Sequence, residues 1–213
     1  MLDPQLYALF LTAAAVLTLA PGPDTLFVLG ASLGDGTRGG LLASAGILTG
    51  LLAHISLAVV GVSVLIAASP LAFELLRWLG VGYLLWIGVL ALRRARRATA
   101  LSAVPVTTRS VRRLYWQGAV TNILNPKVAV FYVAFLPQFV APELGRVPLQ
   151  LLLLGVTHWL MGVPFLAAVA VTSGAVAGWL RRSAGLRRAL DAVSGVLFIG
   201  LALRLLVSRR TPA

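Results

Sequence analysis

The sequence predicts an all-α integral membrane protein with six transmembrane helices, arranged as two inverted three-helix repeats in which helices 1 and 4 are broken. Of its 213 residues, 59% are hydrophobic and only 11% are charged, whereas a soluble domain carries roughly 25% charged residues. Apolar runs of about twenty residues, the length that crosses a bilayer, recur along the whole chain. Two proline motifs, each with an ionisable residue, interrupt such runs at matching places in the two halves.

The predicted spans follow the apolar runs in order. They cover residues 5–30, 39–68, 71–92, 114–140, 148–178 and 186–207. Some exceed the length needed to cross a bilayer, which allows tilt or kinks. We expect a single membrane domain, with a first repeat (1–92), a basic linker (93–113) and a second repeat (114–213). No basic region precedes the first run and no small-residue cleavage site follows it, so we expect it to stay as a helix.

The charge is strongly basic. Seventeen Arg and one Lys against six acids give a net charge of +12, but the Arg lie between apolar runs, where they orient helices and meet anionic headgroups. We therefore expect no nucleic-acid partner. Twelve Arg fall on one side of the predicted topology and four on the other, which predicts cytoplasmic basic loops and external termini. Arg204, Arg209 and Arg210 count against this orientation.

The first motif is Pro21-Gly22-Pro23-Asp24. Ionisable residues inside a membrane are expensive and are functional candidates by default. The two prolines remove two backbone donors, so the helix should break and restart at Pro23, with Asp24 in its first turn. The structural alternative is a simple kink with Asp24 at the cytoplasmic interface.

The second motif is Asn125-Pro126-Lys127. Asn is a good N-cap and Pro is favoured at the first helical position, so a half-helix should start here. Free amides at such a start can hold an anion, and Lys127 adds a positive charge beside them. The alternative is that Lys127 snorkels to an interface.

A polar stripe precedes the second motif. Gln117, Thr121 and Asn125 recur at i, i+4 and i+8, with Asn122 beside them, so they should face a cavity or the bundle interior. Helix–helix hydrogen bonding is the alternative reading. The predicted substrate site consists of Pro21, Gly22, Pro23, Asp24, Gln117, Thr121, Asn122, Asn125, Pro126 and Lys127.

Matched spacing supports the inverted repeat. Asp24 and Lys127 are 103 residues apart, and His54 and His158, the only two His, are 104 apart. Three spans per half make the halves cross in opposite directions. Asp24, His54 and His158 are the candidates for proton coupling; hydrogen bonding inside the bundle is the alternative role of the histidines.

Glycine spacing predicts close helix packing and a turn. Gly46-x-x-x-Gly50 has the spacing that lets helix backbones approach. The stretch from Gly34 to Gly40 is glycine-rich but lacks the Lys-Ser/Thr ending of a P-loop, so we expect a cytoplasmic turn. Tryptophans mostly lie near span ends, as interfacial anchors do, with Trp159 the exception.

The motifs resemble those of a known family. The run from Leu19 to Thr25, the glycine-rich turn through Gly40, and the stretch from Gln117 to Lys127 that closes on Phe135-Leu-Pro137-Gln138-Phe139 resemble the LysE/RhtB family of bacterial amino-acid exporters. The resemblance covers nearly the whole chain. It implies amino-acid export across the bacterial inner membrane, driven by the proton gradient, and leaves the substrate open because members handle neutral, basic and other small amino acids.

These residues suggest a mechanism. A zwitterionic amino acid would bind between the halves, with its ammonium at Asp24 and its carboxylate at Lys127 and the helix start at Pro126. An unpaired charge costs roughly 2.5–3.5 kcal/mol in a membrane, so we expect Asp24 and Lys127 to pair in the empty site. The expected partners are an amino acid, protons and the bilayer; a homodimer is left open beside a monomer.

Other classes of function remain as alternatives. The absence of Cys excludes disulfides and thiol chemistry, and we expect no cofactor, no metal site and no catalytic residue. Export of a metal ion or another small solute is the main alternative. An intramembrane enzyme is a weaker one, because two His and one Asp could hold a metal but no spacing within one helix supports it. A receptor role would leave the charges inside the membrane without a purpose.

Overall fold

The computed structural model describes residues 2–20, 22–64, 69–96, 110–182 and 184–207, and every regular element in these ranges is helical. In chain order the elements are α1 (Pro4–Leu19), α2 (Pro23–Leu57), the π-helix η1 (Ala58–Val62), α4 (Pro70–Arg96), α5 (Val111–Ile123), α6 (Pro126–Val130), the π-helix η2 (Phe131–Phe135), the 3₁₀ helices η3 (Leu136–Phe139) and η4 (Pro142–Leu144), α7 (Val147–Arg182) and α8 (Ala184–Val207). The all-α prediction is confirmed for the described residues.

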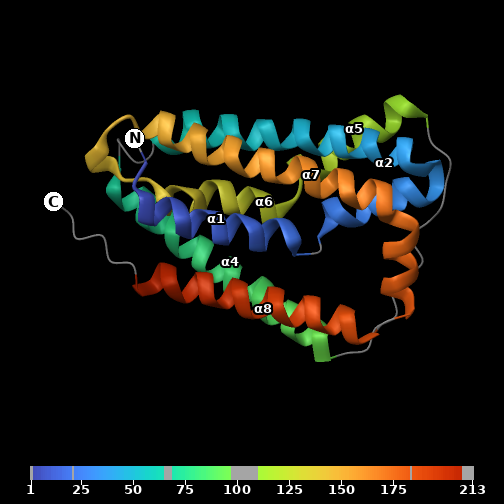
Figure 1. The fold of residues 1–213 in the computed structure, drawn as a ribbon. Helices are drawn as coiled ribbons and strands as arrows, with labels where there is room; N and C mark the ends of the chain where they lie inside the picture. Colours follow the sequence, from blue (N-terminus) through green and yellow to red (C-terminus); the bar gives the residue numbers. More distant parts are fainter. Residues whose placement is uncertain (1, 21, 65–68, 97–109, 183, 208–213) are drawn as a thin grey trace.

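The long helices run along a common direction (Figure 1). α2, α5 and α7 form one side of the bundle, α4 pairs with α8 on the other side, and α1 contacts both α7 and α8. The start of α1 and the end of α8 lie at one end, the left in Figure 1 (the terminal end), while the end of α4 and the start of α5 lie at the opposite end. The predicted linker 93–113 is shorter than expected, since α4 reaches Arg96 and α5 starts at Val111; its residues 97–109 lie outside the described part.

α2 folds back on itself at the end of the bundle opposite the termini. Only Asp35 (φ −117°, ψ 15°) and Gly36 (φ 70°, ψ −176°) leave helical geometry, and Gly40 returns to lie against Ser32. In a straight helix, residues eight apart would be separated by about 12 Å. The turn expected between Gly34 and Gly40 is present, but it is shorter than this stretch, because only Asp35 and Gly36 are non-helical. Gly36 has no Cβ and adopts a positive φ without strain, so two residues are enough to reverse the chain.

The helix lengths support a multi-pass membrane protein. Three stretches are long and apolar enough to cross a bilayer: Pro23–Val62, Trp78–Arg96 and Val147–Ser173. The pair Val111–Ile123 and Pro126–Phe139, bent by 46°, makes a fourth if it counts as one span. Pro4–Leu19 and Asp191–Leu203 are apolar but shorter. The six-crossing arrangement therefore stays a prediction.

Glycines bring the backbones of α2 and α5 into contact. A Cβ at Gly46 would collide with the Tyr115 carbonyl, a Cβ at Gly50 would lie 2.7 Å from the Ala119 carbonyl, and one at Gly118 would collide with α2. The backbones of two helices approach this closely only where a small residue, here glycine, faces the backbone of the other helix. The close packing predicted for Gly46-x-x-x-Gly50 is confirmed, and it fixes α5 against α2.

A similar contact joins α4 to α8. A Cβ at Gly195 would lie 2.8 Å from the Gly88 carbonyl, and a Cβ at Gly88 would lie 3.1 Å from the Gly195 carbonyl. The two helices cross at these glycines. This close contact packs α4 and α8 firmly together, and α8 contacts α1.

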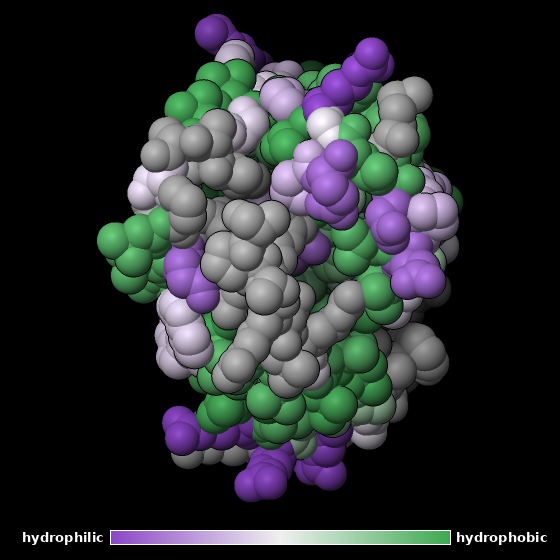
Figure 2. All heavy atoms as spheres, turned by 90° about the vertical axis from the view of Figure 1, so that its left-hand side faces the viewer, coloured by the Kyte–Doolittle hydropathy of each residue, from purple (hydrophilic) through white to green (hydrophobic). Residues whose placement is uncertain are grey.

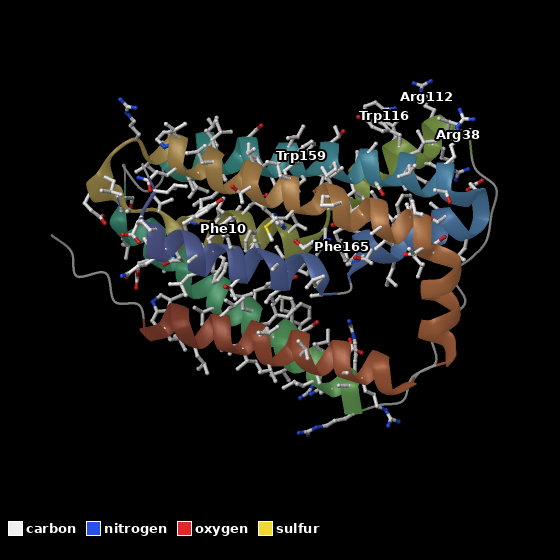
Figure 3. The ribbon with its side chains drawn as sticks, in the orientation of Figure 1. Phe10, Arg38, Arg112, Trp116, Trp159 and Phe165 are labelled. Atoms are coloured by element: carbon white, nitrogen blue, oxygen red, sulfur yellow. The ribbon has the colours of Figure 1, made fainter. Side chains whose placement is uncertain are left out.

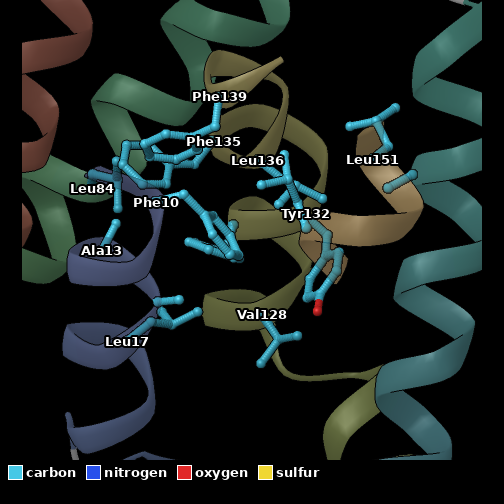
Figure 4. Packing of buried hydrophobic residues seen from close by; sticks show 14 of the residues in the cluster. Phe10, Ala13, Leu17, Leu84, Val128, Tyr132, Phe135, Leu136, Phe139 and Leu151 are labelled. Carbon is cyan, nitrogen blue, oxygen red and sulfur yellow. The ribbon is translucent and has the colours of Figure 1, made fainter. Parts of the chain in front are cut away.

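Aromatic side chains fill the core between α1 and the segment η2–η3 (Figure 4). The ring of Phe10 lies 5.5 Å from that of Phe139, and Phe135 lies 5.0 Å from Phe139 and 5.5 Å from Phe131. All four are buried. Rings at these separations make favourable tilted and edge contacts, so the region between the breaks and the terminal end is rigidly packed.

Basic side chains gather at the end opposite the termini. Arg38 and Arg112 lie there with Trp116 (Figure 3), and α4 reaches the same end with Arg96. At the terminal end, hydrophilic side chains are interspersed with hydrophobic ones (Figure 2). Arg38, Arg96 and Arg112 thus share one end of the bundle, and the orientation of this end in the membrane stays a prediction. Trp159, which does not fit an interfacial role, instead donates to the Leu48 carbonyl at 3.0 Å.

Replacing Gly118 by Val should destabilise the protein, because the new side chain overlaps the α2 backbone. Overpacking of this kind costs about 1–3 kcal/mol, which should lower the thermal unfolding midpoint in detergent micelles by several degrees. Gly82→Val is the matched control, since a Cβ at Gly82 meets nothing within 4 Å. Equal midpoints for the two variants would contradict the packing described here.

Candidate substrate site at the two helix breaks

Both proline motifs coincide with breaks in the helices. α1 ends at Leu19 and α2 restarts at Pro23, with Asp24 in its first turn. α5 ends at Ile123 and α6 starts at Pro126. The half-helix starts predicted at Pro23 and Pro126 are confirmed. Pro21 lies outside the described residues.

Asn125 caps the second half-helix as predicted. Its Oδ1 accepts from the backbone N–H of Lys127 at 3.1 Å, and Pro126 occupies the first helical position. A cap satisfies an amide that the helix itself leaves unpaired. The Asn125 side chain is buried and its Nδ2 has no hydrogen-bond partner among the described residues.

Lys127 closes the end of α1. Its Nζ donates to the carbonyls of Leu17 at 3.0 Å and Ala20 at 2.9 Å. These carbonyls belong to the last turn of α1, where no further helical N–H follows, and a cation is favourable at the negative end of the helix dipole. A residue of the second half of the chain thus completes a helix of the first half, and Lys127 does not snorkel.

Gly22 leaves room for this ammonium. It precedes α2 in an extended conformation (φ −149°, ψ −177°). A Cβ at this position would lie 3.0 Å from Lys127 Nζ and 3.4 Å from its Cε. The glycine of the first motif is therefore needed for space rather than for an unusual backbone angle.

Asp24 is held by Asn122. The Nδ2 of Asn122 donates to Asp24 Oδ2 at 2.8 Å, whereas Asp24 Oδ1 and Asn122 Oδ1 are buried without a hydrogen-bond partner among the described residues. The Asp24 carboxylate acts on the Lys127 ammonium electrostatically, but no direct ion pair joins them in the described structure. The expected direct pairing is not present, because the carbonyls of α1 take the hydrogen bonds of the ammonium and an amide serves the carboxylate.

Asp24 and Lys127 line one cavity of about 50 Å³. Its polar lining consists of Thr18, Asp24, Thr25, Asn122, Lys127 and His158, and its apolar lining consists of Leu17, Ile47, Leu48, Leu51, Val128, Gly162, Phe165 and Leu166. The lining comes from α1, α2, α5, α6 and α7. A space of this size has room for about four water molecules. Two residues of opposite charge thus line a common space, together with Asn122.

The two histidines have different surroundings. His158 lines the cavity, and its Nδ1 hydrogen-bonds with the Tyr132 hydroxyl at 2.9 Å. His54 is buried; its Nε2 lies 3.1 Å from the Asn122 carbonyl and its ring stacks on Tyr132 at 5.9 Å. His54 supports the backbone of the residue that holds Asp24, whereas only His158 of the pair is among the cavity-lining residues.

Sequence reasoning missed Tyr132. It is fully buried between the two histidines, and its hydroxyl points out of the aromatic core (Figure 4). In the sequence it stands in an apolar run, where a tyrosine looks like one more core aromatic. The one available signal was a hydroxyl near the middle of a predicted span, which must find a partner when buried.

The polar stripe does not act as a unit. Gln117 and Thr121 line a second hollow of about 450 Å³ with Phe27, Trp116 and Val120. Residues 118 and 122 face α2, and positions 117 and 121 lie about 100° away around the helix. Since α5 ends at Ile123, the spacing does not extend to Asn125. The prediction that Gln117 and Thr121 join the charged cavity is therefore not supported by their placement.

No metal cluster accompanies these residues in the described part of the chain, where no three His, Asp or Glu side chains come together. The chain has no Cys. The arrangement of His54, His158 and Asp24 therefore gives no support to a metal site.

A multi-pass helical bundle with a buried charged site at two helix breaks defines a membrane transport protein. The family described as "LysE type translocator" matches residues 15–209, and the chain belongs to this family. It is 34% identical over 191 residues to a homoserine/homoserine lactone efflux protein of Salmonella typhimurium, covering 89% of this chain and 90% of the relative. It is also 33% identical over 200 residues to a leucine efflux protein of Enterobacter sp. (strain 638), covering 92% of each.

These relatives are efflux transporters and not enzymes, and the same class applies to this chain. A leucine efflux protein of Salmonella choleraesuis is 30% identical over 203 residues, covering 93% of each chain. No solved structure matches the chain. The resemblance inferred from the two motifs is confirmed.

Replacing Lys127 by Met should destabilise the protein even without substrate. The Leu17 and Ala20 carbonyls lose their donor, and a buried group left unpaired costs about 1–3 kcal/mol. We expect a lower thermal midpoint in micelles than for Arg112→Met, which removes an exposed cation at the start of α5. Indistinguishable midpoints would show that Lys127 does not stabilise the end of α1.

Proposed function

We propose that the chain exports amino acids across the bacterial inner membrane by proton antiport. The observation that carries the proposal is that Asp24 and Lys127 line one cavity with Asn122, and that Asp24 and Asn122 each keep one side-chain oxygen without a hydrogen-bond partner among the described residues. An amino-acid zwitterion carries an ammonium and a carboxylate group on the same carbon atom, and a cavity lined by one anionic and one cationic side chain offers a partner to each. The relatives named as efflux proteins for leucine and for homoserine support an amino-acid substrate.

The helices support six crossings. α1 has 16 residues, about 24 Å of helix, which is short of a hydrocarbon core of about 30 Å. The first crossing therefore includes α1 and the part of α2 before Asp35. A straight helix over Pro23–Val62, with 40 residues, would be about 60 Å long, twice the core. The fold-back at Gly36 divides this helix between the first and the second crossing.

The contacts also support an inverted repeat. A two-fold axis in the membrane plane would make the second crossing equivalent to the fifth and the third equivalent to the sixth. Equivalent helices that lie near such an axis pack against each other. α2 packs against α7, and α4 packs against α8. The breaks before Pro23 and Pro126 occupy equivalent places in the two halves. We propose that the basic end of this bundle faces the cytoplasm.

In the proposed mechanism the substrate ammonium binds Asp24. The free Asp24 Oδ1 and Asn122 Oδ1 supply two acceptors for it. The carboxylate binds Lys127, whose ammonium has three donors and uses two of them on α1. A substrate that draws Lys127 toward itself weakens the hydrogen bonds between Lys127 and the last carbonyls of α1. Substrate binding is thereby linked to movement of the first helix.

Protonation of the cavity would release the substrate. A proton on Asp24 removes the partner of the substrate ammonium, and a proton on His158 adds a cation beside it. Proton entry from outside would therefore favour release there, and proton loss inside would restore the site. We assign His54 the positioning of Asn122, since its ring nitrogen bonds that residue's carbonyl.

Transport should depend on both amino acid and proton gradient. Inside-out vesicles containing the protein should accumulate a radiolabelled amino acid from a panel of twenty plus homoserine when their lumen is acidic, and a protonophore should abolish this accumulation. Vesicles from cells with an empty vector are the control. Uptake that ignores the pH gradient would exclude proton antiport, and uptake of no member of the panel would exclude amino-acid export.

Replacing Asp24 by Asn should reduce export at least a hundredfold while the protein still inserts, because the neutral amide cannot pair with an ammonium. Asp191→Asn is the matched control, since Asp191 is only partly buried, in α8, and is not among the cavity-lining residues. Protein amounts in the membrane are compared by immunoblot. An Asp24→Asn protein with full activity would remove this residue from the mechanism.

A further inference from the structure

We propose that the cavity selects amino acids with an uncharged side chain and that Gly162 sets the largest side chain it accepts. This inference rests on the proposed function and adds a substrate class to it. It is carried by how polar and apolar groups are distributed over the cavity wall and by the open space at one glycine of α7.

The charged groups of the cavity are accounted for by the common part of an amino acid. Asp24 and Asn122 present free oxygens suited to the α-ammonium, and Lys127 presents a cation suited to the α-carboxylate. Among the described lining residues, His158 is the one other ionisable group, and its Nδ1 is already engaged by Tyr132. In the proposed cycle His158 gains a proton only at release, so no charged partner is left for a substrate side chain when the substrate binds.

The remaining wall is apolar. Ile47, Leu48 and Leu51 line it from α2, and Phe165 and Leu166 line it from α7. A charged side chain buried against these groups would lose its water without gaining a partner. Aliphatic side chains instead gain free energy by leaving water. The hydroxyl groups of Thr18 and Thr25 in the same lining can hydrogen-bond a single hydroxyl group of a substrate.

Gly162 stands between the polar and the apolar parts of this wall. It follows His158 by one helical turn and precedes Leu166 by another, so all three lie on one face of α7. A Cβ at Gly162 would meet only Leu48 Cδ2, at 3.5 Å, which is ordinary contact. By contrast, a Cβ at Gly155 on the same helix would lie 2.9 Å from Ile55. The glycine at 155 serves packing, whereas the glycine at 162 leaves room in the cavity.

The side chains opposite Gly162 can adjust to the substrate. Leu48 and Phe165 are only partly buried, and Phe165 lies on the inner side of α7 (Figure 3). The cavity of about 50 Å³ must widen to hold an amino acid, and these side chains border the space into which it would widen. A larger residue at 162 would occupy that space first.

The test uses the full chain, purified and reconstituted in proteoliposomes with an imposed pH gradient. Uptake of radiolabelled leucine and alanine is measured for the wild type, Gly162→Val and Gly200→Val. Gly200 in α8 is the control, because a Cβ there meets nothing within 4 Å. Unlabelled lysine and glutamate are added as competitors against each labelled substrate.

We expect lysine and glutamate to compete at least tenfold less well than leucine in the wild type. Gly162→Val should lower the ratio of leucine to alanine transport at least tenfold, and Gly200→Val should leave it unchanged. An equal loss of both substrates in Gly162→Val, or effective competition by lysine, would overturn the inference while leaving amino-acid export intact. Uptake of no member of the panel of twenty amino acids plus homoserine by the wild type would instead contradict the proposed function.

Gly162→Ala keeps the inference testable if the valine variant does not fold. One added carbon at 3.5 Å from Leu48 is compatible with the native packing. The ratio of leucine to alanine transport should then fall about threefold. A ratio equal to that of the wild type in a folded Gly162→Ala protein would exclude a role of this position in size selection.

Discussion

The hydrogen bonds from the Lys127 ammonium to the carbonyls of Leu17 and Ala20 are the interaction on which the site depends. A helix that ends inside an apolar bundle has no water for its last carbonyls, and each must find a donor within the protein. Lys127 supplies two donors from the other half of the chain. The ammonium that satisfies the carbonyls at the end of α1 is also available to an anionic substrate group. Lys127 therefore serves both the stability of the helix break and the proposed binding of substrate.

The second break uses amides in place of charge. Asn125 caps the start of α6, and Asn122 holds one oxygen of Asp24. His54, which is not among the cavity-lining residues, bonds the backbone carbonyl of Asn122. Within the described residues, this chain of contacts leaves one oxygen on each of Asp24 and Asn122 buried without a hydrogen-bond partner, which is costly unless a ligand or water supplies a donor. These two oxygen atoms are therefore the acceptors that we propose for the substrate ammonium.

The glycine contacts give these polar groups their positions. The close approach of α2 and α5 at Gly46 and Gly118 brings Asn122 beside the start of α2. The reversal at Gly36 lets one continuous apolar stretch contribute both to the first break and to the wall of the cavity. Aromatic packing around Phe10 and Phe135 closes the space toward the terminal end. The polar site therefore lies inside a bundle whose backbone geometry is set by small residues and rings.

The sequence by itself determined the class of fold, the two helix breaks and most of the charged site. Proline, asparagine and ionisable residues act locally, so Pro23, Asn125 and Pro126 mark helix starts wherever the chain goes. Only the tertiary structure decided the partners. Lys127 bonds α1 rather than Asp24, Gln117 and Thr121 line a different hollow, and Tyr132 joins His158. These outcomes depend on how helices far apart in the chain are rotated and packed, which local spacing does not encode.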